Sequence, residues 1–222
     1  MDWTTGCTVE QGHTAITELV TFHAGWWGRT RLNNMDWLVR RDMANWRKNF
    51  APRWNALDEA SKSALPESII PIGEKLAHGE EEIFGRWSAV PQTLTHGDYH
   101  FKNTLFTPNG GSLLAVVDWS NLGASPGSTD LSYFVTHSLA AAARKEHEKE
   151  LVRLYCDTLL KCGVSQCDFE ACWDEYRLWA LDIGMLWATI PKEGRVHIEI
   201  WDLLMSRLSS AIIELDADEF VV

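Results

Sequence analysis

Apolar residues recur at three- and four-residue steps along most of the chain, and this period predicts a mostly helical protein. The first predicted helix starts after Thr8, because Thr8 and Gln11 form a T-x-x-Q capping box. Its apolar face consists of Ile16, Leu19, Val20, Ala24 and Trp27. A second helix is predicted over residues 35–50, where Pro52 stops it. Its inward face is expected to consist of Leu38, Val39, Met43 and Trp46.

Further helices follow from the same period. They are predicted at residues 58–65, 66–87, 128–143, 145–162, 168–190 and 195–214. Their expected core consists of Leu151, Leu154, Tyr155, Leu159, Trp179, Ile183, Trp187, Ile200, Leu204 and Leu208. No linker rich in Pro, Gly or Ser interrupts the chain, so residues 1–222 are predicted to form one domain.

The pattern changes near residue 90, where short extended segments replace the helical period. The predicted strands are residues 94–95, 103–106 and 113–117. A turn signal at Asn109 and Gly110 joins the last two into a β-hairpin, which would hold Asp118 and the loop of residues 96–103 at one end. Residues 119–128 are expected to form a loop. The predicted fold class is therefore α+β, mostly α, with a small β element in the middle.

The stretch LTHGDYHFKNTLF, residues 94–106, concentrates polar side chains between apolar flanks. His96, Asp98 and Asn103 follow the H-x-D-x-x-x-x-N pattern of a kinase catalytic loop. In that chemistry a carboxylate accepts the proton of the attacking hydroxyl, and an amide oxygen further along faces a metal ion on the nucleotide phosphates. A second carboxylate must hold the metal from the other side. Asp118 meets that requirement, because it ends an apolar strand.

Three segments together resemble a known family. LTHGDYHFKNTLF followed by LLAVVDWSNLGASPGSTDLSYF resembles the aminoglycoside phosphotransferase and choline kinase superfamily, and within it the ecdysteroid kinase-like, or CHK kinase-like, branch. HTAITELVTFHAGWWG is similar to the helix that follows the hinge in these kinases. The resemblance implies a protein-kinase-like C-terminal lobe that transfers the γ-phosphate of ATP, with Mg²⁺, to a hydroxyl group of a small molecule.

The same resemblance assigns roles to the candidate site residues. Asp98 is implied to be the catalytic base, and Asn103 and Asp118 are implied to bind the metal and the nucleotide. Two histidines complete the candidate catalytic set. His96 is implied to organise the loop, and His100 either contacts the transferred phosphate or is a solvated loop residue.

Two features of the motif favour a small-molecule kinase over a protein kinase. Gly97 stands where protein kinases carry an Arg, and the interval from Asp118 to Asp130 is too short for an activation loop. Asp130 itself, in STDLSYF, is implied to anchor the catalytic loop and to cap its own helix. The alternative is that Asp130 is an ordinary acidic residue at a helix N-terminus.

A kinase of this superfamily also has a preceding lobe, which this sequence is expected to lack. The first Lys is Lys48, inside a predicted helix, and no Gly-rich strand–turn–strand precedes it. We therefore expect a truncated catalytic lobe with low activity alone, and a homodimer through the surface that the N-terminal lobe would cover. One alternative is a non-catalytic remnant that binds a ligand or partner. Another is a metal-dependent hydrolase that uses His96, Asp98, His100 and Asp118.

Composition excludes several other classes. The formal net charge of -11 argues against nucleic-acid binding, which needs clustered Lys and Arg. The N-terminus lacks the features of a signal peptide, and no segment approaches about 18 consecutive apolar residues, so no membrane span is expected. The absence of a C-x-x-C pair favours reduced thiols in a cytoplasmic protein over a zinc site. The cysteines are Cys7, Cys156, Cys162, Cys167 and Cys172.

The identity of the acceptor stays open. The helices after residue 145 carry the acidic residues Asp174, Glu175, Asp182, Glu193, Glu199 and Asp202 among the tryptophans Trp173, Trp179, Trp187 and Trp201. Acidic groups beside aromatic rings favour a quaternary or multiply charged amine. Solvated acids on one helix face and core tryptophans on the other explain the same residues, and a steroid or other apolar alcohol fits equally well.

Overall fold

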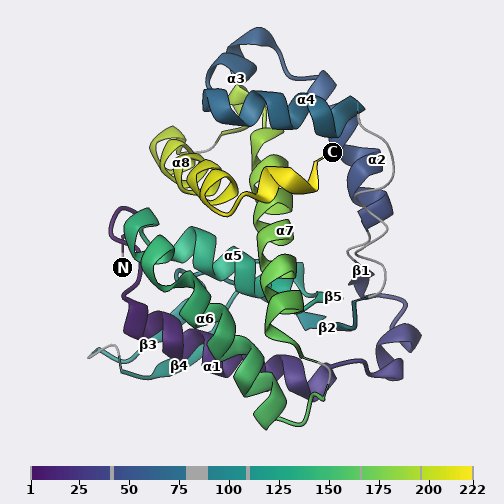
Figure 1. Ribbon diagram of the computed structural model, residues 1–222, viewed down its shortest axis with the longest axis vertical. Coiled ribbons are helices and arrows are strands. Elements are labelled where there is room, and N and C mark those ends of the chain that lie inside the picture. Colours follow the sequence, from purple (N-terminus) through teal and green to yellow (C-terminus); the bar gives the residue numbers. More distant parts are fainter. Residues whose placement is uncertain are drawn as a thin grey trace. The chain divides into compact units, whose positions relative to one another are not determined.

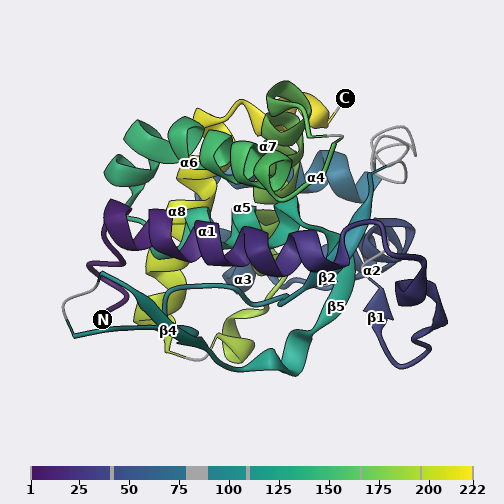
Figure 2. The same ribbon diagram turned by 90° about the horizontal axis from the view of Figure 1, so that it is seen from below.

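The helix predicted at the start of the chain is present as α1 (Val9–Trp26) in the computed structural model, where it lies beside α6 (Ala141–Lys161) (Figures 1 and 2). The predicted capping box is confirmed, because Thr8 Oγ1 accepts a hydrogen bond from Gln11 N–H at 3.2 Å and Gln11 Oε1 accepts one from Thr8 N–H at 3.0 Å. The structure describes residues 2–40, 43–78, 90–108, 111–165, 167–195 and 197–221.

The chain forms two compact units. Unit 1 consists of residues 1–41 and 91–179, and unit 2 of residues 42–90 and 180–222. The remaining helices are α2 (Met43–Asn55), α3 (Glu59–Ser63), α4 (Ile70–His78), α5 (Ser128–Ser138), α7 (Phe169–Ala188) and α8 (Ile198–Glu214). The protein is mostly helical α+β, as predicted. The assignment of residues 1–222 to one lobe stays a prediction.

A three-stranded sheet in unit 1 has the order β1-β5-β2. Its strands are β1 (Val39–Arg40), β5 (Gly123–Pro126) and β2 (Gln92–Thr95). β5 pairs in parallel with β1 and antiparallel with β2. The prediction of a loop over residues 119–128 is therefore wrong for β5. Its GASP sequence lacks the β-branched and aromatic residues that mark a strand, but its small side chains fit a position between two strands.

Two of the predicted strands are present and pair with each other. β3 (Thr104–Phe106) and β4 (Leu113–Val116) pair antiparallel and lie side by side in Figure 1. The Asn109-Gly110 turn that was expected to join them lies outside the described residues. β2 and β4 also contact α1, so the hairpin and the start of the 96–103 loop are packed on the same helix.

The helix predicted over residues 35–50 is wrong in its first half. Val39 belongs to β1, where it pairs with Gly123, and its side chain is 64% exposed instead of inward. Leu38 is buried as predicted, in a cluster with Leu32 and Leu94. Val39 therefore belongs to an edge strand, although the spacing of the apolar residues in this segment is helical.

Pro52 does not stop α2, which continues to Asn55. A proline removes one backbone hydrogen bond from a helix, but burial of nearby apolar side chains can offset that loss. Trp54 is completely buried and packs against Gly73 of α4, so the turn after Pro52 contributes to the core of unit 2. The side chains of Met43 and Trp46, also predicted to face inward, lie outside the described residues.

The later helices agree with their predicted positions except at one junction. The helix predicted over residues 128–143 ends at Ser138 as α5, and α6 begins at Ala141. Ser138 accepts hydrogen bonds from distant backbone groups, at its carbonyl from Cys7 N–H and at its hydroxyl from Phe101 N–H. These contacts end α5 inside an alanine-rich stretch that carries no breaker. The predicted core is buried, apart from the partly buried Leu154, Trp187 and Ile200.

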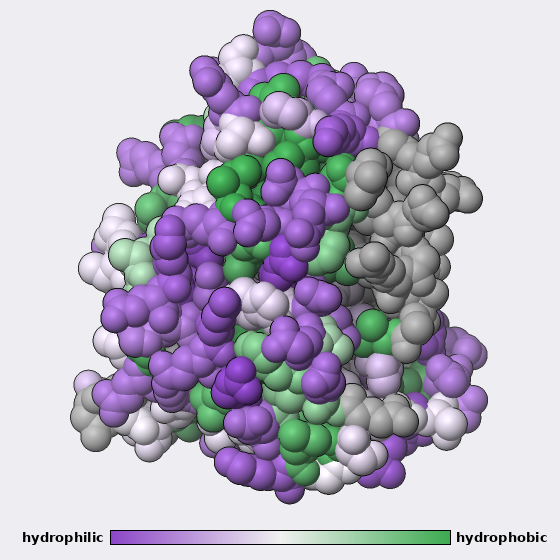
Figure 3. Space-filling view, in the orientation of Figure 1, coloured by the Kyte–Doolittle hydropathy of each residue, from purple (hydrophilic) through white to green (hydrophobic). Residues whose placement is uncertain are grey.

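Hydrophilic side chains are spread over the face shown in Figure 3, with smaller apolar patches between them. Among the described residues, no helix is both long and apolar enough to cross a membrane.

Candidate active site

Asp130, in the first turn of α5, holds the start of the candidate catalytic loop. Its carboxylate is completely buried and accepts hydrogen bonds from the backbone N–H groups of His96 at 2.7 Å and Gly97 at 2.9 Å. The expected anchoring role is therefore supported by direct contacts. Asp130 does not cap its helix, because the N-cap of α5 is Gly127 and no side chain caps it. The carboxylate serves a distant loop instead of its own helix end.

His23 of α1 supports Asp130 from the other side. Its Nε2 lies 3.2 Å from Asp130 Oδ2, and its Nδ1 lies 2.7 Å from the hydroxyl of Tyr155. Burial alone would raise the pKa of the Asp130 carboxyl, but His23 and the two backbone donors lower it below its ordinary value. Sequence reasoning missed His23, although it follows Ile16, Leu19 and Val20 on the apolar face of α1; its partner could not be read from the sequence. A polar ring on such a face needs a buried partner.

His96 connects the candidate loop to the hairpin. Its Nδ1 accepts a hydrogen bond from Asp98 N–H at 3.2 Å, and its Nε2 lies 2.9 Å from the carbonyl oxygen of Val117. The ring is buried and lies 4.6 Å from the ring of Trp119, centroid to centroid. Both ring nitrogens are therefore engaged with the backbone. This geometry suits an organising residue and leaves no nitrogen for a metal ion.

Asp98 and Asn103 are directly bonded. Asn103 Nδ2 donates to the backbone oxygen of Asp98 at 2.9 Å and to its Oδ2 at 3.2 Å. Burial alone would raise the pKa of the Asp98 carboxyl, but hydrogen bonds from His100 and Tyr133 and the charge of His100 outweigh burial and lower that pKa to about 2. Asp98 is therefore ionised at neutral pH, and its side chain has a fixed orientation.

His100 faces Asp98, with 3.5 Å between Nε2 and Oδ1, and its side chain is only 12% exposed. The centroid of its ring lies 5.1 Å from that of Trp3 and 6.1 Å from that of Tyr133. The ring is therefore mostly covered by protein, whereas contact with phosphate stays a prediction. Sequence reasoning missed Trp3 and Tyr133, because they come from the N-terminal segment and from α5. Only tertiary structure brings them to this loop.

Asp118 lies beside Asn103 through the backbone, because Val117 N–H donates to the carbonyl oxygen of Asn103 at 2.9 Å. Its side chain is exposed, and Ser120 Oγ donates to its Oδ1 at 2.7 Å. Asp118 has φ 60° and ψ 65°, a left-handed conformation that costs a non-glycine residue free energy and is concentrated at functional sites. The Asp118 carboxylate is therefore exposed to solvent, at the end of the hairpin where Asp118 was expected.

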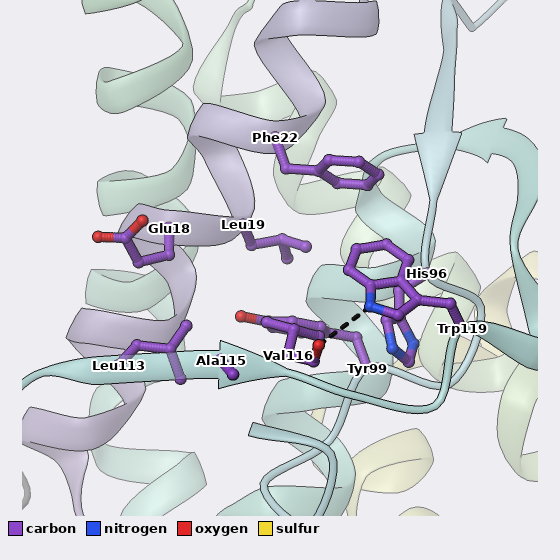
Figure 4. A pocket seen from close by; sticks show the side chains of 9 residues that line it. All are labelled: Glu18, Leu19, Phe22, His96, Tyr99, Leu113, Ala115, Val116 and Trp119. Carbon is purple, nitrogen blue, oxygen red and sulfur yellow. Dashed lines mark hydrogen bonds between the residues drawn. The ribbon is translucent and has the colours of Figure 1, made fainter. Parts of the chain in front are cut away.

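A cavity of about 300 Å³ lies between α1 and β4, beside the loop (Figure 4). Its lining consists of Glu18, Leu19, Phe22, His96, Tyr99, Leu113, Ala115, Val116 and Trp119. Trp119 closes one side, where its Nε1 donates to Val116 O at 3.0 Å and its ring lies 5.2 Å from that of Phe22. Asp98 and Asn103 do not line this mostly apolar cavity. It therefore adjoins the polar network at His96.

The structure thus joins His96, Asp98, His100 and Asn103 in one network, with Asp118 attached through Val117. Within the described parts of the chain, no cluster of three His, Cys, Asp or Glu side chains could hold a metal ion. The four-ligand site of the hydrolase alternative is therefore not formed. Mg²⁺ has a smaller requirement, because one or two carboxylates together with substrate phosphates commonly bind it.

Comparison with known proteins identifies a family and similar solved structures. The model of the ecdysteroid kinase-like family matches residues 32–166, which include every candidate site residue. No curated protein matches the chain. A solved structure of the amicoumacin kinase hAmiN in complex with AMP-PNP, Ca²⁺ and Ami is similar, with 12% identity and a TM-score of 0.41. The alignment covers 94% of this chain and 61% of the neighbour, so this chain spans less than two thirds of that protein's length.

Proposed function

Because the chain belongs to the ecdysteroid kinase-like family, we propose that it carries the catalytic loop of an ATP-dependent phosphotransferase acting on a hydroxyl group of a small molecule. The observation that carries the proposal is the joint anchoring of two loops. Asp130 holds the backbone at residues 96–97, and the His96 ring is hydrogen-bonded to the carbonyl oxygen of Val117, the residue before Asp118. Phosphoryl transfer depends chiefly on positioning and on charge stabilisation, and this anchoring fixes the base and a metal ligand together.

In this proposal Asp98 accepts the proton of the acceptor hydroxyl. Its carboxylate is ionised, partly exposed and oriented by Asn103 Nδ2 and by His100. A low pKa makes Asp98 a weak base at equilibrium, so orientation of the hydroxyl is its main contribution. His96 organises the loop. His100 positions Asp98. Its contact with the Asp98 carboxylate supports this role more directly than it supports binding of phosphate.

Asn103 and Asp118 would hold Mg²⁺, and the residues fit this ion. The Asn103 amide nitrogen is used by Asp98, which leaves its oxygen for a hard cation, and the Asp118 carboxylate is exposed. Bound Mg²⁺ supplies neutralisation of charge on the nucleotide phosphates. The side chains of this chain orient that ion and the acceptor.

Efficient transfer would also need a group that holds the phosphates from the opposite side. No Lys precedes Lys48 in the sequence, so we infer that the 222 residues alone transfer phosphate slowly. Losing a single charge-stabilising donor typically lowers a rate by ~10²–10³. We also infer a cytoplasmic location, because all five cysteines are free thiols.

Titration calorimetry with Mg²⁺ and a non-hydrolysable ATP analogue tests the site. We expect the two to bind together and Mg²⁺ alone to bind weakly, because the phosphates complete its coordination. Asp118→Ala should weaken binding at least tenfold, whereas Asp36→Ala, which removes an exposed carboxylate elsewhere in unit 1, should not change it. Unchanged binding in Asp118→Ala would remove Asp118 from the site. Tight Zn²⁺ binding lost in His96→Ala would instead support the hydrolase.

A further inference from the structure

Three cysteine side chains of unit 1 gather where α6 passes into α7. Cys156 is buried on α6, Cys172 is buried in the first turn of α7, and Cys167 is partly exposed in the segment between the helices. Cys162 lies in the same turn but is exposed. The candidate active site uses none of these thiols.

The turn after α6 brings Cys167 back to Cys156. Gly163 has φ +88°, and Gly163 N–H and Val164 N–H donate to the carbonyl oxygens of Leu160 and Leu159, both at 3.0 Å. This left-handed turn ends α6 and reverses the chain. The Cys167 sulfur consequently lies 2.8 Å from the Cys156 sulfur, so a small movement of either side chain would bring the two sulfurs to the length of a disulfide bond.

Cys167 differs chemically from its two neighbours. Hydrogen bonds from the Cys172 and Cys156 thiols favour its thiolate and lower the pKa of Cys167 to about 7, although burial and the carboxylates of Glu175 and Asp168 oppose this. Burial and the contact with Cys167 raise the pKa of Cys156 to about 12. Glu175 is itself buried and bonded to Ser128 Oγ, and burial raises its pKa. Cys167 is also the most exposed of the three, so it is the sulfur that a dissolved oxidant reaches first.

We propose that Cys167 is a reactive thiol that hydroperoxides oxidise and that Cys156 then converts into an intramolecular disulfide. In the first step the Cys167 sulfur attacks the peroxide, the O–O bond breaks, and sulfenic acid and an alcohol or water are formed. In the second step the Cys156 sulfur attacks the sulfenic sulfur, and the S–S bond forms as the S–O bond breaks. The hydroxyl group leaves as water with the proton of the Cys156 thiol. Two thiols lose two electrons in total, and one hydroperoxide is reduced. A metal site is the competing use of such thiols, but no metal-binding cluster exists among the described residues.

The test is limited oxidation of the reduced full chain with one equivalent of hydrogen peroxide, followed by alkylation and non-reducing peptide mapping by mass spectrometry. We expect a Cys156–Cys167 linked peptide that is about 2 Da lighter than the sum of its reduced parts, with Cys162 still open to alkylation. Cys162→Ser is the matched control and should leave the yield unchanged. Cys156→Ala should stop the reaction at the sulfenic acid of residue 167, which dimedone traps.

Three outcomes would overturn the proposal or part of it. Oxidation of Cys162 while Cys167 stays reduced would show that exposure alone governs reactivity at this turn. A Cys167–Cys172 bond would overturn the assignment of Cys156 as the partner. Loss of the linked peptide in Cys167→Ser is expected, and its persistence would exclude Cys167. Circular dichroism of each variant confirms that it is folded before its reactivity is compared. The proposal does not depend on phosphoryl transfer.

Discussion

At the scale of single residues, one buried carboxylate organises the candidate site. Asp130 accepts hydrogen bonds from two backbone N–H groups and contacts His23 Nε2. These three polar groups are buried, and the carboxylate takes the place of the water that would bind them in the unfolded chain. The spacing of Asp98, Asn103 and Asp118 could be recognised in the sequence, because their order along one loop and one hairpin reflects their chemistry. Partners from other elements, such as His23 and Tyr133, could not, since only the packed fold brings them together.

Asp130→Asn should strongly destabilise unit 1. The amide NH2 group of an asparagine would face one of the two backbone N–H donors, and the negative charge beside His23 would be lost. We therefore expect the free energy of unfolding to fall by ~2–4 kcal/mol. Asp118→Asn is the matched control, because Asn tolerates a left-handed backbone and the site is exposed; it should stay within about 0.5 kcal/mol of the wild type. Urea denaturation measures both. Equal stability of the two variants would refute the anchoring role.

The pH dependence of stability should report Asp98. Burial raises the pKa of its carboxyl, but His100 and Tyr133 lower that pKa by a larger amount. The net result is a pKa of about 2, below the ordinary value of 3.8. A lowered pKa means that the contribution is complete above about pH 4 and is lost as the pH falls toward 2. The wild type should therefore lose up to about 2 kcal/mol relative to Asp98→Asn between pH 5 and 2. A stability difference that is constant over this range would contradict the shift.

At the scale of elements, the sequence predicted those with clear start and stop signals. The capping box at Thr8 located α1, and the apolar run before Asp118 located β4. β1 was missed because it is only two residues long and follows apolar residues at helical spacing, and β5 because its residues have little strand preference of their own. The pairing of β5 with two neighbours on opposite sides decides its conformation, and this information is not local.

The close approach within this sheet can be tested at Gly123. A Cβ atom there would lie 2.8 Å from the carbonyl oxygen of Val39, which cannot move without disturbing β1. We expect Gly123→Ala to cost ~1–3 kcal/mol in thermal or urea unfolding. Gly25→Ala, in α1 with no atom within 4 Å of the added Cβ, should instead be neutral or stabilise by about 0.4–1 kcal/mol. A neutral Gly123→Ala would mean that β1 and β5 are not tightly paired.

At the scale of the whole molecule, the hairpin presents apolar side chains to solvent. Leu105 is 46% exposed, Val117 38% and Trp119 41%, next to the exposed carboxylate of Asp118. In the proposed function this surface faces the nucleotide and a further lobe. We propose that the 222-residue chain alone uses it to form a homodimer, since exposed apolar patches promote association.

Sedimentation velocity over a range of concentrations tests the dimer. Leu105→Lys places a charge in the proposed interface and should raise the dimer dissociation constant at least tenfold. Leu160→Lys is the matched control, because Leu160 is similarly exposed, at 45%, on α6. Monomeric behaviour of the wild type at all concentrations, or equal dissociation constants for both variants, would contradict an interface at the hairpin.

The most direct test of the central claim is ATP turnover on a panel of hydroxylated acceptors. We compare the 222-residue chain with the same chain extended by an N-terminal lobe from this family, each with Asp98 or Asn at position 98. The account predicts slow transfer by the short chain, faster transfer after extension, and a loss of ~10²–10⁴ in rate in the extended Asp98→Asn variant. Nucleotide binding with no turnover in any form would favour the non-catalytic alternative. Turnover that survives Asp98→Asn unchanged would contradict the proposed active site.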